Sequence, residues 1–210
     1  MDLLVIEECP ERHRAATQRH SITTHRTIRG DDRVVMVRSD GTPRGMMKSL
    51  KHIVETEELS DTVCITRDNT FVIGEWDPCR AWALELSARK ERKGAMSDAM
   101  VATLSELFRQ LEDGVVMKGT YDFEGKVPKA FHLPTLKKAL EIGAPKGMLL
   151  DTLYFNMVGE IPVRHSDPVE RFWMYNYNPV GPIVTLEDTC YSNNDCHIWI
   201  RKQALIPATA

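Results

Sequence analysis

The chain has 210 residues, of which 42% are hydrophobic and 27% charged, with a formal net charge of -3. This length and composition are typical of one globular domain spanning residues 1–210, and the weak charge gives no general attraction to nucleic acid or membranes. No apolar run approaches the roughly 18 residues that cross a bilayer, and the N-terminus turns acidic where a signal peptide would stay apolar. We therefore expect a cytoplasmic protein without a membrane partner.

The cysteines predict free thiols. Their number is odd and no two of them form a CxxC pair, so the sequence indicates neither a disulfide framework nor a zinc site. They are Cys9, Cys64, Cys79, Cys190 and Cys196. We expect no bound metal.

The first segments predict a strand, a basic helix and a second strand. Residues 3–7 fit a strand, and residues 11–20 fit a helix with a basic face that ends before Ser21. Residues 33–38 are rich in β-branched side chains and predict a strand that enters a turn at residues 39–43.

Two interpretations of the next segment stay open. Residues 45–48 fit the returning strand of a hairpin. Met46, Leu50, Ile53 and Val54 instead fit one face of a helix.

A tight hairpin is predicted further along the chain. Strands at residues 62–66 and 70–73 flank Asp68 and Asn69, which tolerate the left-handed backbone of a tight turn.

The clearest helix is predicted at residues 97–111, where apolar side chains keep a 3.6-residue spacing and Ser97 fits the N-cap. It is preceded by a strand at residues 83–87 and a basic run at 89–93. A second amphipathic helix is expected at residues 134–142.

The remaining segments are predicted as strands. These strands lie at residues 115–118, 153–158 and 161–163, and a final hairpin joins residues 183–186 to 197–200.

The order of these elements resembles that of the GNAT acyltransferases. Within that superfamily, residues 82–89 (Trp-Ala-Leu-Glu-Leu-Ser-Ala-Arg) are similar to the Trp-Glu-x-Ser-Arg pattern of acyl-homoserine-lactone synthases and related N-acyl amino acid synthases. Residues 40–45 and 136–143 are similar to an earlier hairpin and a later helix of that branch.

The resemblance implies a fold and a reaction. The fold is an α/β (α+β) three-layer sandwich, in which helices flank a central mixed, splayed β-sheet. Its core spans residues 1–163, and residues 164–210 form a C-terminal extension of unknown role. The reaction is transfer of an acyl group from acyl-CoA or acyl-carrier protein to the amine of a small acceptor, as in the autoinducer synthesis of quorum sensing.

The resemblance also implies the site residues. Glu85 would act as the general base or as the carboxylate that orients the amine. Arg89 would be its ion-pair partner or a substrate clamp, and Ser87 lies beside them. The phosphates of the donor would bind at the N-terminus of the following helix, because a helix N-terminus attracts anions. That position holds Arg92, Lys93, Gly94 and Ala95. An acidic acyl-carrier protein would contact the basic loop 89–93.

Departures from the family pattern keep other hypotheses open. The phosphate loop retains Gly94 alone, and Ala139 stands where many GNAT enzymes carry a tyrosine as general acid. The missing tyrosine fits the lactone-synthase branch. Both departures are also expected of a catalytically silent regulator or inhibitor that binds a protein partner on a GNAT-like fold. Asp113, Glu124 and Lys126 are similar to the magnesium-binding set of many nucleases, but the residues around Glu124 favour an ordinary turn. Nucleic acid is therefore not an expected partner.

Overall fold

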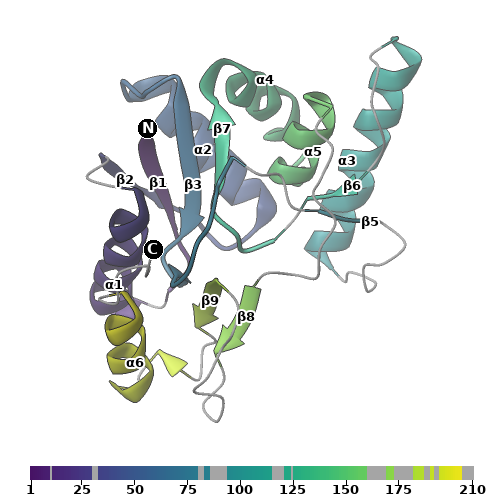
Figure 1. Ribbon diagram of the computed structural model, residues 1–210. Coiled ribbons are helices and arrows are strands. Elements are labelled where there is room, and N and C mark those ends of the chain that lie inside the picture. Colours follow the sequence, from purple (N-terminus) through teal and green to yellow (C-terminus); the bar gives the residue numbers. More distant parts are fainter. Residues whose placement is uncertain are drawn as a thin grey trace.

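The computed structural model of the protein is a mixed α/β fold in which helices flank an open sheet (Figure 1). It describes residues 1–9, 11–29, 33–79, 83–85, 94–114, 121–123, 125–159, 169–172, 182–186, 190–191 and 194–204.

The central sheet has the strand order β2-β1-β3-β7. The first strand, β1 (Asp2–Glu7), lies between β2 (Val34–Arg38) and β3 (Thr62–Arg67) and is parallel to both. The edge strand β7 (Lys129–His132) is antiparallel to β3. The carboxyl ends of three parallel strands therefore meet at one edge of this sheet.

The remaining elements are arranged around that sheet. They are α1 (Glu11–Arg29), α2 (Pro43–Thr56), β4 (Thr70–Val72), β5 (Leu84–Glu85), α3 (Ala95–Glu112), β6 (Tyr121–Asp122), α4 (Leu133–Gly143), α5 (Leu150–Met157), β8 (Val169–Phe172), β9 (Ile183–Leu186) and α6 (Asn194–Ala204).

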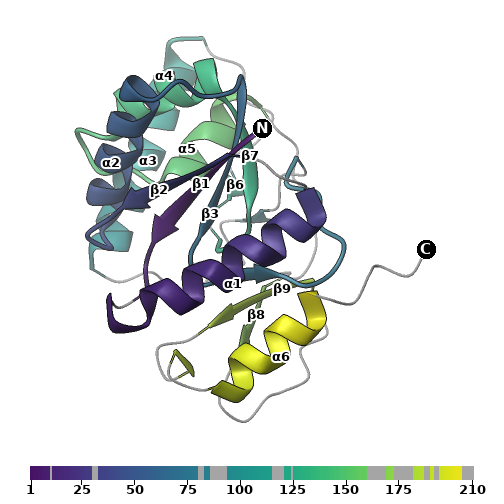
Figure 2. The ribbon, with the colours of Figure 1, turned by 90° about the vertical axis from the view of Figure 1, so that its left-hand side faces the viewer.

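The two crossover helices cover opposite faces of the sheet. The chain runs from β1 through α1 to β2, and then returns through α2 past β1 to β3, so the two right-handed crossovers lie on opposite sides. Alternate residues of β1 agree with this arrangement, since successive strand side chains point to opposite faces. Leu4 and Ile6 belong to the large core shared with α2, α4 and α5, whereas Leu3 and Val5 pack with Ile22 of α1. Figure 2 shows α1 and α2 on the two sides of the strands.

A second sheet joins the C-terminal part of the chain to its first half. Its strand order is β4-β9-β8, and Phe71 of β4 packs in one small core with Val184 of β9 and with Cys190 and Ile200. Helix α6 contacts α1. Part of the expected C-terminal extension is therefore an integral layer of the fold.

Many of the elements predicted from periodicity are confirmed. Strands β1, β2, β3, β4 and β9 and helices α3 and α4 all form where strands and helices were expected. The helical interpretation of residues 45–54 is also confirmed, because that segment lies in α2. Thr42 and Pro43 explain why this segment is a helix rather than a strand. The Thr42 side chain accepts a hydrogen bond from the Gly45 N–H, and Pro43 follows at the start of the helix.

Several boundaries and pairings were predicted wrongly. Helix α1 continues to Arg29 rather than ending before Ser21, whose hydroxyl instead donates to the Thr70 carbonyl at 2.6 Å. Helix α3 begins at Ala95 with Gly94 at the N-cap, so Ser97 does not cap it. Strands β3 and β4 do not form a hairpin in the described sheets, because β4 pairs with β9.

Two predicted strands are helices. Residues 153–158 fall mostly in α5, which is buried on almost every side and therefore lacks a polar face. Residues 197–200 fall in α6. The expected strands at residues 115–118 and 161–163 lie outside the described residues.

Candidate functional site

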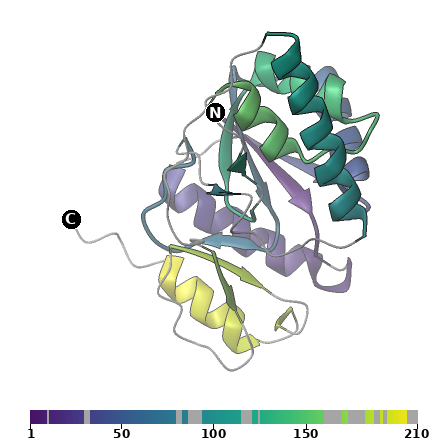
Figure 3. The ribbon, with the colours of Figure 1, turned by 90° about the vertical axis from the view of Figure 1, so that its right-hand side faces the viewer.

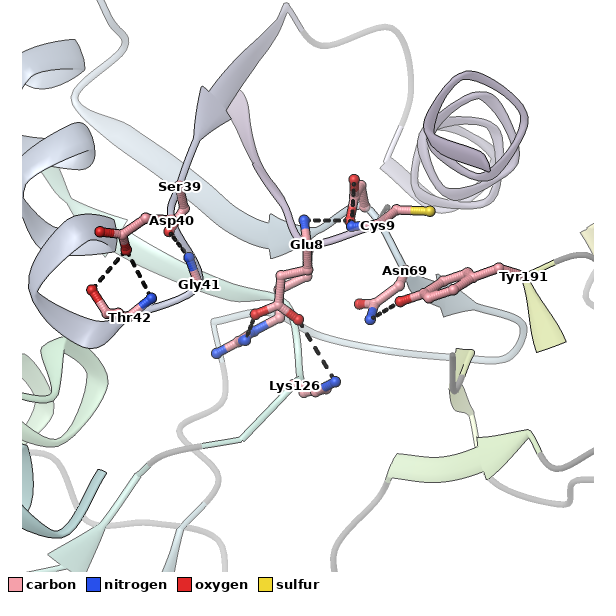
Figure 4. Close-up of polar contacts among 11 residues, drawn as sticks. Glu8, Cys9, Ser39, Asp40, Gly41, Thr42, Asn69, Lys126 and Tyr191 are labelled. Atoms are coloured by element: carbon pink, nitrogen blue, oxygen red, sulfur yellow. Dashed lines mark hydrogen bonds and ion pairs between the residues drawn. The ribbon is translucent and has the colours of Figure 1, made fainter. Parts of the chain in front are cut away.

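A polar cavity of about 430 Å³ lies at the carboxyl edge of the central sheet. The crossovers after β1 and β2 leave this edge toward opposite faces, and open α/β sheets bind their ligands at such a switch point. The cavity is lined by Glu7, Glu8, Cys9, Arg14, Ser39, Asp40, Gly41, Asn69, Lys126 and Tyr191. Figure 4 shows most of these residues and the elements from which they come.

The end of β1 is held in place by a buried carboxylate. Asp68, which directly follows β3, accepts hydrogen bonds from the backbone N–H of Glu8 at 2.8 Å and of Cys9 at 3.0 Å. Burial raises the pKa of Asp68 from 3.8 to about 6, although hydrogen bonds from Cys9 and Gln18 act in the opposite direction. Asp68 thereby fixes the position of Glu8 at the cavity wall.

Glu8 joins two cations across the cavity wall. Its carboxylate forms an ion pair with Arg67 and lies 3.6 Å from Lys126 Nζ (Figure 4). The neighbouring Glu7 is 3.3 Å from Arg14. The wall therefore carries carboxylates and cations together, which suits a ligand with both donor groups and negative charge.

Asn69 presents a buried acceptor at the cavity. Its side-chain amide donates to the Tyr191 hydroxyl at 3.0 Å, and the residue is 2% exposed. Its Oδ1 atom has no hydrogen-bond partner among the described residues. A buried acceptor without a partner costs about 1–3 kcal/mol of folding free energy. A donor group on a bound ligand would give this oxygen a hydrogen-bond partner.

The β2–α2 turn forms a preorganised wall. Asp40 accepts hydrogen bonds from the Thr42 N–H at 2.8 Å and from the Thr42 hydroxyl at 2.6 Å, and these bonds lower the pKa of the Asp40 carboxyl. Gly41 has a φ of 78°, a conformation that side chains disfavour. A Cβ atom on Gly45 would lie 1.9 Å from Asp40 Oδ1, so a larger residue there would displace this carboxylate.

A second, much smaller cavity lies beside the first. It has room for about one water molecule, at about 20 Å³, and is lined by Arg67, Lys129 and Asp151 among other residues. Lys129 is buried, and its ammonium donates to the Phe123 carbonyl at 2.7 Å and pairs with Asp151. Because Glu8 lines the large cavity and Arg67 the small one, their ion pair lies between the two.

The residues implied by the GNAT resemblance are only partly described. Glu85 lies in β5, opposite Tyr121 of β6, in a two-stranded sheet separate from the central one. Gly94 and Ala95 are exposed at the start of α3, and Gly94 has a φ of 58°. Ser87, Arg89, Arg92 and Lys93 lie outside the described residues. The expected acyl-transfer site is therefore not tested by these contacts.

The set that resembles a nuclease site is not brought together in the described part of the chain. Lys126 pairs with Glu8, and Asp113 lies 2.5 Å from Arg109. Glu124 is outside the described residues. Within the described ranges, no three His, Cys, Asp or Glu side chains form a group that could hold a metal ion.

The residues of the cavity were not recognised as a site in the sequence. Glu7, Glu8 and Asp40 were assigned to strand ends and turns, and Asp68 and Asn69 to a hairpin. A signal was present, because each of three neighbouring strand segments ends in acidic or small polar residues. This signal indicates a shared site only when the segments between the strands are recognised as crossover helices.

Comparisons with known proteins do not assign the chain to a family. No family model matches it, and no curated protein is significantly similar to it in sequence. None of the helices in the described ranges is long and apolar enough to cross a membrane.

Proposed function

We propose that this protein binds a nucleoside diphosphate, as part of an activated donor, in the cavity at the carboxyl edge of the central sheet. The observation that carries this proposal is the place of the cavity. The β1–α1–β2–α2–β3 unit, with strand order β2-β1-β3, has the connectivity that begins a flavodoxin-like doubly wound sheet, and the cavity lies at its switch point.

The size of the cavity and some of its side chains fit such a ligand. Its volume of about 430 Å³ lies within the range of small-molecule sites. Arg14 and Lys126 supply positive charge for phosphate groups, and α1 and α2 both begin at this edge, where helix N-termini favour anions. Asp40 and the unpartnered Asn69 Oδ1 supply acceptors for base or ribose donors.

The proposed chemistry is transfer of a hydroxyl-rich group from that nucleotide. Glu8 presents carboxylate oxygens that suit hydroxyl groups, for example those of a sugar. A hydroxyl oxygen of the acceptor would form a bond to the transferred carbon and lose its proton to water. The bond from that carbon to the diphosphate oxygen would break, and the diphosphate would leave with the electron pair. Lys126, which lines the cavity, lies where positive charge would stabilise the departing diphosphate.

A ligand screen tests this proposal directly. Thermal unfolding is measured with ADP, GDP, UDP and CDP, and with the matching nucleosides and inorganic phosphate. A nucleotide present at 100 times its dissociation constant should stabilise the protein by about 2.7 kcal/mol. If no nucleotide raises the melting temperature and none binds by calorimetry, the proposal is wrong.

Replacing Lys126 by Met should weaken binding of the nucleoside diphosphate by about 10- to 100-fold, because a hydrogen bond to a charged group contributes about 1.5–3 kcal/mol. Binding of the uncharged nucleoside should not change. The control is Lys202→Met, which removes the same charge from an exposed position on α6. Equal effects of both substitutions on diphosphate binding would contradict a phosphate contact at Lys126.

Acyl transfer is a second hypothesis, favoured by the start of α3. This 18-residue helix begins at exposed residues, and no side chain caps its N-terminus by a hydrogen bond, so its N–H groups suit an anionic donor. Because CoA itself contains a nucleoside diphosphate, the discriminating donors are acyl-carrier protein and acyl-pantetheine. A response to these donors would favour acyl transfer, and a response to neither class would favour the catalytically silent regulator.

Replacing Glu85 by Gln should abolish acyl transfer to a small amine without weakening donor binding, because it removes the proposed general base and keeps the shape of the side chain. A positioned base contributes about 10²–10⁴ in rate. Turnover is measured by mass spectrometry of the amide product, with the melting temperature as a folding control. An unchanged rate in a preparation that transfers acyl groups would exclude Glu85 from the reaction.

A further inference from the structure

One side of the large cavity is formed by the uncharged side chains of Asn69 and Tyr191. Asn69 follows β3, whereas Tyr191 belongs to the C-terminal part of the chain, whose helix α6 lies against α1 (Figure 3). The side-chain amide of Asn69 donates to the Tyr191 hydroxyl at 3.0 Å. Figure 4 shows this pair on one side of Glu8 and the turn at residues 39–42 on the other. The two sides of the cavity therefore differ in chemistry.

The position of Asn69 is fixed by contacts of both its backbone and its side chain. Its carbonyl accepts a hydrogen bond from the Leu186 N–H of β9 at 3.0 Å, and its Nδ2 atom donates to Tyr191. Leu186 and Tyr191 pack in one small core with Phe71. The Oδ1 atom of Asn69 therefore stays where Figure 4 shows it, directed away from Tyr191 on the side of Glu8.

Asn69 offers a hydrogen-bond acceptor to a ligand. The residue is buried, and its Oδ1 atom has no hydrogen-bond partner among the described residues. A buried polar atom without a partner is costly, whereas a paired one is not. A ligand group that brings an N–H to this oxygen is therefore favoured, and a group that brings a lone pair is disfavoured.

The base is the part of a nucleoside diphosphate that fits this oxygen. Phosphate groups carry acceptors and negative charge, and they suit Arg14 and Lys126 elsewhere in the wall. Ribose hydroxyl groups suit a carboxylate, which Asp40 supplies in the turn. A side-chain amide instead suits the amino group of a base, as in the recognition of adenine by asparagine. These complementarities favour a base at Asn69.

We propose that Asn69 determines the base specificity of this protein and selects a base that carries an exocyclic amino group. This inference rests on the nucleotide proposal above. Adenine, cytosine and guanine each have such a group, which projects from the ring and donates to an acceptor. Uracil has none, and its ring N–H lies between two carbonyl oxygens, which would bring further acceptors toward Asn69 Oδ1. UDP is therefore expected to bind most weakly of the four common nucleoside diphosphates.

Calorimetry with ADP, GDP, UDP and CDP tests this inference on the unmodified protein. The nucleotide that binds most tightly should be ADP, GDP or CDP. It is then compared with the analogue that lacks the amino group, which is the diphosphate of purine riboside, inosine or pyrimidin-2-one riboside, respectively. The analogue should bind about 10-fold more weakly, because Asn69 Oδ1 loses its partner.

The outcomes separate this inference from the nucleotide proposal. Tightest binding of UDP, or equal binding of the parent nucleotide and its analogue, would overturn the base specificity and leave nucleotide binding intact. If none of the four nucleotides binds, the nucleotide proposal fails and the base specificity fails with it.

Two substitutions test whether Asn69 is the residue that recognises the amino group. Asn69→Leu removes the acceptor, so the parent nucleotide and its analogue should bind equally. Asn69→Asp keeps an oxygen acceptor at the same place, so the preference for the parent should remain. Binding of inorganic diphosphate should be the same in both variants and the wild type, which controls for the integrity of the cavity. A preference that survives in Asn69→Leu would overturn the role of Asn69.

Discussion

Replacing Lys129 by Met is expected to lower the free energy of unfolding by about 3–5 kcal/mol, because it breaks a buried ion pair and leaves its partner uncompensated. Lys129 is 1% exposed, and its ammonium both pairs with Asp151 and donates to the Phe123 carbonyl. Met keeps most of the volume and the flexibility of the side chain, so the loss reports on charge and hydrogen bonding rather than packing. Urea unfolding measures it.

A double variant distinguishes the contribution of the ion pair from the cost of leaving one buried charge unpaired. Lys129→Met with Asp151→Leu removes both charges, and it should recover a large part of the lost stability because no unpaired charge remains. Lys202→Met, at an exposed site, should change stability by no more than about 0.5 kcal/mol. A loss of under about 1 kcal/mol in the single variant would show that Asp151 does not depend on Lys129.

The parallel strands were predictable because they are buried. Residues 3–7 and 62–66 are runs of apolar and β-branched side chains, and burial on both faces of a parallel sheet favours such runs. The α3 and α4 helices were predictable for the complementary reason, since each keeps apolar side chains at helical spacing. These patterns depend on local sequence, which a single chain supplies.

The failures come from elements whose partners are distant in sequence. The strand at residues 70–73 was assigned to a hairpin with its neighbour, but β4 pairs with β9 near the C-terminus. Residues 153–158 read as a strand because α5 is buried on almost every side and shows no polar face. Local pattern cannot distinguish a short buried helix from a buried strand.

The cavity was missed because it is a property of topology. Glu8, Asp40 and Asn69 follow three different strands, and each has an ordinary local explanation as a turn or strand end. They line one cavity because the strand order places β1 between β2 and β3.

Asp68 is expected to make stability fall as the pH rises from about 4 to about 6. The pKa of Asp68 is raised from 3.8 to about 6 in the folded protein, chiefly by burial. The folded state then holds a proton that the unfolded chain releases between these values, so the proton's stabilising contribution is present below pH 4 and is lost above pH 6.

The slope from this single group can reach about 1.4 kcal/mol per pH unit. Asp68→Asn should remove that slope, because the amide does not titrate and still offers an oxygen to the N–H groups of Glu8 and Cys9. Urea unfolding of both proteins at pH 4, 5, 6 and 7 measures the difference, in which the contributions of the other carboxyls cancel. Parallel curves would show that Asp68 titrates alike in the folded and unfolded chain. A difference confined to pH 4–6 would instead identify Asp68 as the buried acid that holds the end of β1 against the cavity. Nucleotide binding measured across the same pH range would show whether ionisation of Asp68 changes the affinity for the ligand.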